Sequence, residues 1–111
     1  MVNVKNIKNC DEFNSFKNEN DGNLKIVKVG AEWCGPCRVM AQTIHDLDEN
    51  KLENVLFAEL DIEDDGVDQI AVDYSIRNIP VLLFFKNGEL VHKTVGSLNA
   101  ESIYNAINQY K

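Results

Sequence analysis

The sequence predicts an α/β fold in which a central mixed sheet of about five strands is flanked by about four helices. Apolar, strand-like segments alternate with amphipathic, helix-like segments along most of the 111 residues. Near the C-terminus two strand-like segments are joined directly by Asn87-Gly88, the dipeptide that most strongly favours a β-hairpin. We therefore expect parallel pairing where helices alternate with strands, and an antiparallel edge at the hairpin.

The first part of the chain predicts two strands separated by a short helix. Residues 2–8 alternate weakly between apolar and polar side chains, which favours a strand. Asn9, followed three residues later by Glu12, resembles a capping box and opens a helix over residues 10–18. After a polar turn, a run rich in β-branched residues predicts a strand over residues 24–30.

The middle of the chain predicts a long helix, a strand and a short helix. The long helix follows two cysteines, and its buried stripe has helical spacing: Cys37, Met40, Ile44 and Leu47. Residues 54–62 favour a strand. The short helix lies within residues 64–76, and its apolar positions again recur at helical spacing: Val67, Ile70, Ala71 and Tyr74.

The last part of the chain predicts the hairpin and a final helix. Residues 81–85 are all apolar and form the first hairpin strand, and residues 90–95 form the second. Asn99 is placed to cap the final helix. The buried face of that helix has the expected spacing: Ile103, Ala106, Ile107 and Tyr110.

Length and composition favour one domain over residues 1–111, which we expect to be a monomer. The formal net charge of −7 disfavours nucleic acid and anionic membranes as partners, because both attract clustered Lys and Arg. No apolar run approaches the ~20 residues that cross a bilayer. The first ten residues lack the apolar block of a signal peptide. We therefore expect a cytoplasmic protein, in a compartment that keeps thiols reduced.

Two cysteines two residues apart lie in the stretch AEWCGPCRVM, residues 31–40. Such a pair can be a redox couple, half of a metal site, or two inert buried thiols. In a reducing compartment it is more often catalytic or metal-binding than structural. A structural zinc usually takes four Cys or His ligands, and the remaining candidates, Cys10, His45 and His92, form no second closely spaced pair. We therefore expect no metal site.

The position of the pair favours redox chemistry. Cys34 follows a predicted strand and begins a helix, where unpaired N–H groups and the helix dipole stabilise a thiolate. Cys37 lies about one helical turn further on, close enough to form a disulfide. Gly35 permits a close approach, and Pro36 suits the first turn, where its missing N–H has no cost. Cys34 is thus predicted to attack a partner's disulfide, and Cys37 to resolve the mixed disulfide.

The motif WCGPC, together with the downstream segments SIRNIPVLLFFKNGE and VGSL, resembles the thioredoxin family. The resemblance covers essentially the whole chain. It implies the thioredoxin fold and a thiol–disulfide oxidoreductase that reduces protein disulfides through Cys34 and Cys37. It also implies that the protein needs no cofactor and works through the redox-active disulfide between Cys34 and Cys37. A thioredoxin reductase is expected to reduce this disulfide again after each reaction.

The resemblance also implies a substrate-binding surface. It implies that the Ile79–Pro80 bond is cis and that the backbone of Ile79 pairs with an extended substrate; the alternative is a trans proline at the start of a strand. The implied surface consists of residues that surround the cysteines: Trp33, Gly35, Pro36, Ile79, Pro80, Val95 and Gly96. For Trp33 the alternative is a core position, but its place in a loop between strand and helix favours docking.

Two charged residues depart from the family pattern. Thioredoxins usually carry a buried Asp where this chain has Lys28, and a Lys where it has Glu59. Each charge interrupts an apolar strand face, and both predicted strands end at the same edge of the sheet. Because a lone buried charge is very costly, we expect the two to pair. The alternative is two unrelated, solvated residues at strand ends. Gly30 is a further departure, where thioredoxins often have a second tryptophan.

The exchanged charges affect one step of the family's mechanism. The Asp is thought to help deprotonate the second cysteine, which the ammonium of Lys28 cannot do. Either Glu59 acts as the base through water, or Lys28 does so after losing its own proton. The positive charge of Lys28 also favours a thiolate at the neighbouring cysteines.

The dipeptide between the cysteines favours a reductant over an oxidant or isomerase. Gly-Pro is typical of thioredoxins, whereas relatives from oxidising compartments more often have a His there. A different class of function stays open, namely a redox-independent binding module or a subunit of a larger complex that uses the same fold. Cysteine-to-serine variants separate the two classes, because only a pure binding role survives them.

Overall fold

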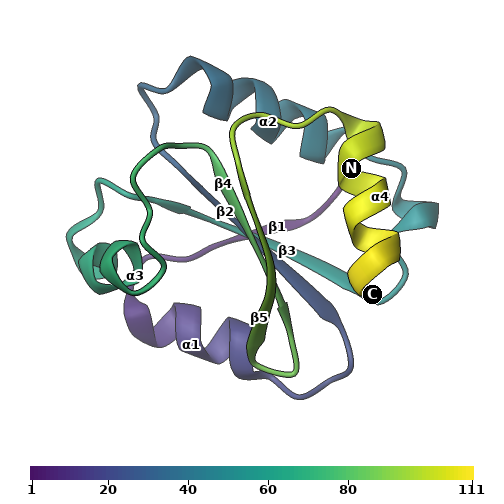
Figure 1. The fold of residues 1–111 in the computed structure, drawn as a ribbon, viewed down its shortest axis with the longest axis horizontal. Coiled ribbons are helices and arrows are strands. Elements are labelled where there is room, and N and C mark those ends of the chain that lie inside the picture. Colours follow the sequence, from purple (N-terminus) through teal and green to yellow (C-terminus); the bar gives the residue numbers. More distant parts are fainter.

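The computed structural model describes residues 1–111 as a five-stranded sheet with helices on both faces (Figure 1). The strands are β1 (Val4–Asn6), β2 (Leu24–Gly30), β3 (Val55–Asp61), β4 (Val81–Lys86) and β5 (Glu89–Val95). The helices are α1 (Cys10–Asn18), α2 (Gly35–His45), α3 (Asp68–Asp73) and α4 (Ala100–Tyr110). Two short 3₁₀ turns also occur, η1 (Glu49–Lys51) and η2 (Asp65–Val67). The predicted α/β fold with a mixed sheet is confirmed.

Local signals in the sequence set several of these boundaries. Helix α1 and strand β2 begin and end at the predicted residues, whereas β1 is shorter than predicted. At the start of α1 the side chain of Asn9 accepts a hydrogen bond from the backbone N–H of Glu12 at 2.9 Å. The Glu12 carboxylate accepts in turn from the backbone N–H of Lys8 at 2.7 Å, one residue before the cap. This reciprocal arrangement is a variant of the expected capping box.

The strands lie in the order β1-β3-β2-β4-β5, with β3 parallel to both β1 and β2. We expected parallel pairing up to the hairpin, but β4 already runs antiparallel to β2. The cause is the connection through α3, whose six residues span only about 9 Å and do not carry the chain back along the sheet. The chain therefore enters β4 at the edge where β2 and β3 end, and the antiparallel part begins one strand earlier than predicted.

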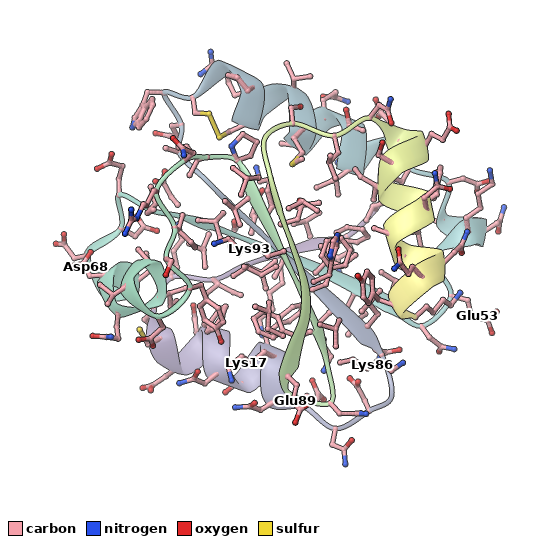
Figure 2. All side chains as sticks on the ribbon, viewed as in Figure 1. Lys17, Glu53, Asp68, Lys86, Glu89 and Lys93 are labelled. Atoms are coloured by element: carbon pink, nitrogen blue, oxygen red, sulfur yellow. A yellow bond between two sulfur atoms is a disulfide. The ribbon has the colours of Figure 1, made fainter.

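The sheet separates two apolar layers, and the charged side chains of Glu53, Asp68 and Glu89 lie at the periphery (Figure 2). Helices α2 and α4 cover one face, where Leu24, Ile26 and Met40 belong to a core of 14 buried residues. Helices α1 and α3 cover the other face, which has a core of 13 buried residues. Each fully buried Leu, Ile or Phe contributes about 1.5–3 kcal/mol to the free energy of folding. Every residue of β2 is buried, so this strand is the centre of both layers.

Lys25 is a buried charge that the sequence pattern did not reveal. Its side chain is only 1% exposed, although it lies on the central strand β2. The ammonium donates to the carbonyl of Glu19 and lies 3.2 Å from the Asp21 carboxylate. It also lies 6.0 Å from the centre of the Phe16 ring. The loop before β2 thus supplies the partners that make this burial tolerable.

Asp21→Asn is predicted to make the free energy of unfolding less sensitive to acid. A hydrogen bond from the backbone N–H of Asn23, and in addition the ammonium of Lys25, hold the pKa of Asp21 below its ordinary value of 3.8. The carboxylate therefore stabilises the fold above that value, and the contribution disappears as the pH falls through the lowered pKa. Because the Asp21 side chain is 27% exposed and Lys25 keeps its hydrogen bond to the carbonyl of Glu19, we expect a loss of about 1 kcal/mol at neutral pH.

Urea unfolding of the wild type and of Asp21→Asn at neutral and at strongly acidic pH measures this difference. The gap between the two proteins should shrink in acid. A gap that is equal at both pH values would show that the lowered pKa of Asp21 does not contribute to stability.

Candidate active site

Cys34 and Cys37 lie at the start of α2 and are joined as a disulfide. Cys34 is the N-cap residue of the helix, and its sulfur accepts a hydrogen bond from the backbone N–H of Cys37 at 3.2 Å. Pro36 occupies the first turn of α2, where a proline ring is compatible with the helix. The two Cα atoms are 5.2 Å apart, within the range of about 4.4–6.8 Å that a disulfide bridges. The helix start therefore holds both sulfurs in position for reversible bond formation.

Gly30, the last residue of β2, allows Cys37 to pack closely against the sheet. A Cβ atom on Gly30 would lie 3.2 Å from both the Cβ and the Sγ atom of Cys37. That is tighter than most contacts of a real side chain. The sequence singled out Gly30 only as a departure from the family, and the structure shows that it leaves room for the buried cysteine.

Lys28 and Glu59 form the ion pair that the strand faces predicted. They lie opposite each other in the parallel register of β2 and β3. The Lys28 Nζ atom is 3.3 Å from a carboxylate oxygen of Glu59, and the side chains are 11% and 35% exposed. The alternative of two unrelated, solvated residues is therefore wrong.

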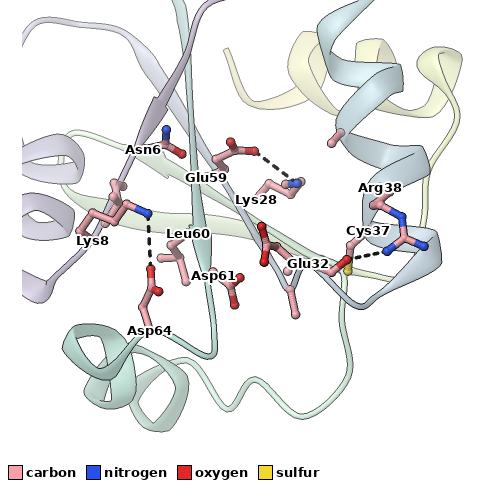
Figure 3. A pocket seen from close by; sticks show the side chains of 14 residues that line it. Asn6, Lys8, Lys28, Glu32, Cys37, Arg38, Glu59, Leu60, Asp61 and Asp64 are labelled. Carbon is pink, nitrogen blue, oxygen red and sulfur yellow. Dashed lines mark hydrogen bonds and ion pairs between the residues drawn. The ribbon is translucent and has the colours of Figure 1, made fainter.

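A cavity of about 450 Å³ connects this ion pair to Cys37 (Figure 3). Lys28, Gly30, Cys37 and Glu59 all line it. The cavity is rich in charge, and its other charged lining residues are Lys8, Glu32, Arg38, Asp61 and Asp64. Cys37 thus borders a charged, solvent-accessible space formed by β2, β3 and α2.

The predicted substrate-binding residues are only partly exposed. The Ile79–Pro80 peptide bond is cis, and Ile79 packs against the small buried cluster that contains both cysteines. The backbone N–H of Gly96 donates to the carbonyl of Pro80 at 2.8 Å, which brings the end of β5 beside them. Pro80 is buried, Gly35, Ile79 and Gly96 are half-buried, and Pro36 is exposed.

Two large apolar side chains project into solvent from this region. Trp33 is 66% exposed and Val95 is 57% exposed, so Trp33 is not a core residue. The indole Nε1–H of Trp33 donates to the carboxylate of Glu63 at 3.1 Å. The sequence analysis did not single out Glu63 and therefore missed this contact. The only signal was the position of Glu63, just after β3 ends at the edge where Trp33 lies.

No group of three or more His, Cys, Asp and Glu side chains is arranged to hold a metal ion. Cys10 is half-buried, and its thiol donates to the carbonyl of Gly66 at 3.3 Å. No helix is both long enough and apolar enough to cross a membrane.

Comparisons with known proteins agree with this geometry. A family model described as thioredoxin matches residues 4–109. Thioredoxin from Callithrix jacchus is 33% identical over 107 residues, covering 96% of this chain and 98% of the relative. Thioredoxin from Chlamydia caviae is 34% identical over 101 residues, covering 91% and 93%. The X-ray structure of Fasciola hepatica thioredoxin superposes with a TM-score of 0.84 at 29% identity, covering 97% of this chain and 100% of that one.

Thioredoxins work through their own cysteine pair without a cofactor, and the same pair is present here at the start of α2. The match extends over nearly the whole chain and includes the arrangement of sheet and helices. This chain belongs to the thioredoxin family, and it is a thiol–disulfide oxidoreductase that acts through Cys34 and Cys37.

Proposed function

We propose that this chain, as a single monomeric thioredoxin domain over residues 1–111, reduces the disulfides of other proteins in the cytoplasm. Members of the family generally act on protein disulfides and are recharged by a thioredoxin reductase. The observation that carries the proposal is the helix N-terminus that holds Cys34, with a backbone N–H directed at its sulfur. A reducing compartment suits this role, since it keeps the pair in the dithiol form that donates electrons.

Cys34 is the attacking residue in this proposal. In the reduced protein its thiolate attacks one sulfur of the substrate disulfide, and the other substrate sulfur leaves as a thiolate that takes a proton from water. Cys34 is then joined to the substrate. Cys37 attacks the sulfur of Cys34, which forms the internal disulfide and releases the second substrate thiol. Two electrons pass from the cysteine pair to the substrate.

The different surroundings of the two sulfurs support this order. Cys34 caps the helix, where the dipole and the free N–H groups favour a thiolate. It is 5% exposed, whereas Cys37 is 2% exposed and packs against Gly30. A bulky protein disulfide therefore reaches Cys34 more readily, and Cys37 needs only to reach its neighbour.

The exposed apolar side chains beside Cys34 are the proposed docking surface. Trp33 and Val95 supply contact area, and the half-buried Ile79 and Gly96 present backbone close to the cysteines. Gly96 has a φ angle of +95° and open space where a Cβ would be, so a substrate backbone can approach it.

Replacing Cys37 with Ser is expected to trap the substrate. Cys34 can still attack, but no second thiol resolves the mixed disulfide, so a covalent complex with a disulfide-containing protein accumulates. Mass spectrometry of the isolated complex identifies the linked cysteine. Cys10→Ser is the matched control, because Cys10 lies outside the site, and it should leave turnover unchanged.

The reverse variant, Cys34→Ser, should form this complex far more slowly. Equal trapping through Cys37 would contradict the assignment of the attacking residue. Failure of the wild type to reduce any protein disulfide, with binding that survives both serine variants, would instead favour a binding module.

Val95→Glu is predicted to weaken the reduction of protein disulfides with little change in stability. A charge on the proposed docking surface opposes burial against an apolar partner, and we expect about a 5–30-fold loss in kcat/KM, the effect of about 1–2 kcal/mol at an interface. Reduction of a small soluble disulfide, which does not cover the surface, should change much less.

Leu90→Glu is the matched control for this experiment, since Leu90 is another exposed apolar residue near the opposite end of β5. It should leave kcat/KM for the protein substrate unchanged. Equal losses for Val95→Glu and Leu90→Glu would show that Val95 does not belong to a docking surface.

A further inference from the structure

A buried ammonium group faces the cavity that Cys37 lines. Lys28 and Gly30 are two residues apart on β2, so their positions share the face of the sheet that α2 covers. Gly30 contacts Cys37 directly, and Lys28 lies one position earlier along the same face. Figure 3 shows Lys28 between Glu59 and the helix that carries Cys37. Lys28 is thus a buried cation that lines the same cavity as Cys37.

The charge of Lys28 is held in place by the sheet. The parallel register places Lys28 opposite Glu59, and their side chains meet at 3.3 Å. Lys28 is mostly buried, whereas Glu59 is about one third exposed and connects the pair to solvent. The carboxylate partner and the polar cavity lower the free-energy cost of burying the Lys28 ammonium.

We propose that Lys28 acts electrostatically in the exchange reaction, stabilising the thiolate of Cys37 from the cavity side, while Glu59 orients Lys28 and offsets part of its charge. This inference rests on the proposed function, in which Cys37 is the resolving thiol. The resolving step then needs no base in contact with Cys37. The thiol loses its proton to water in the cavity, and the ammonium offsets the negative charge that remains on sulfur.

The bonds and electrons of the step balance without a further reactant. The Cys37 thiolate attacks the Cys34 sulfur of the mixed disulfide, and the bond between Cys34 and the substrate breaks. The electron pair of that bond leaves on the substrate sulfur, which takes a proton from water. Cys34 and Cys37 end as the disulfide seen in the structure.

Other charges line the cavity but are less able to act on Cys37. Arg38 is exposed on α2, and its guanidinium donates to the carbonyl of Glu32. Lys8 is exposed and pairs with Asp64 at 3.9 Å. Glu32 is also exposed, and Asp61 is half-buried at the end of β3. Solvent and salt screen exposed charges strongly, whereas the mostly buried Lys28 is screened much less.

The pKa of the Cys37 thiol tests the proposal, measured from the ultraviolet absorbance of its thiolate in a background that carries both Cys10→Ser and Cys34→Ser, so that Cys37 is the only thiol. Adding Lys28→Met should raise that pKa by about one unit, a tenfold loss of thiolate below the pKa. Lys28→Arg should keep it near the starting value, because the positive charge is retained. In the protein with both cysteines, Lys28→Met should make the couple more reducing by about 30 mV for each tenfold change.

Lys25→Met is the matched control. Lys25 is a second buried lysine on β2, with the same charge, but it lies on the opposite face of the sheet beside Asp21. Its removal should leave the pKa of Cys37 unchanged. An equal shift from Lys25→Met and Lys28→Met would show a general effect of charge or packing and would overturn the proposal.

Glu59→Gln provides a second test of the proposal, which does not require the Lys28→Met variant to fold. It removes the negative charge that offsets Lys28, so the pKa of Cys37 should fall. An unchanged or raised pKa in this variant would overturn the proposal, as would an unchanged pKa in Lys28→Met. Either result would overturn only the role of Lys28 if the Cys37→Ser variant still forms the covalent complex with a substrate through Cys34. The disulfide-exchange function would then stand.

Discussion

The parallel pairing of β2 with β3 positions most of the groups that surround the cysteines. The two strands are aligned over seven residue pairs, from Leu24 opposite Val55 to Gly30 opposite Asp61. This register brings Lys28 against Glu59, and it makes both strands end at the same edge of the sheet. The loop after β2 then leads to Cys34, and the loop after β3 leads to Glu63, which binds Trp33. Because β2 is buried on both faces, a shift of register would expose the core of both layers.

The cysteine pair consequently has two unlike surroundings. On one side Trp33 and Val95 form an exposed apolar region suited to contact with another protein. On the other side a charged cavity reaches Cys37 beneath the helix. Substrate docking and the control of charge on the resolving sulfur are therefore carried by different residues. A substitution among the exposed apolar residues can alter substrate recognition without altering the chemistry of the thiols. A substitution in the charged cavity can alter the thiol chemistry without altering recognition.

The sequence predicted those features that depend on local chemistry. Neighbouring residues determine the cap at Asn9, the bounds of β2 and the start of α2 directly after Cys34. The Lys28–Glu59 pair was also predictable, because each charge interrupts an apolar strand face. Features that depend on the path of the chain in space were missed. The direction of β4 follows from the short crossing through α3, and the burial of Lys25 depends on a loop that folds over its ammonium.

A double-mutant cycle on Lys28 and Glu59 tests most directly whether the register of β2 and β3 holds a coupled charge pair at the site. Urea unfolding of the wild type, Lys28→Met, Glu59→Gln and the double variant gives the four free energies of unfolding. The ion pair predicts that the double variant is more stable than the sum of the two single losses indicates, with a coupling of about 0.5–3 kcal/mol. Single losses that add to within about 0.3–0.5 kcal/mol would show that the two residues do not interact, and would contradict this account of the site.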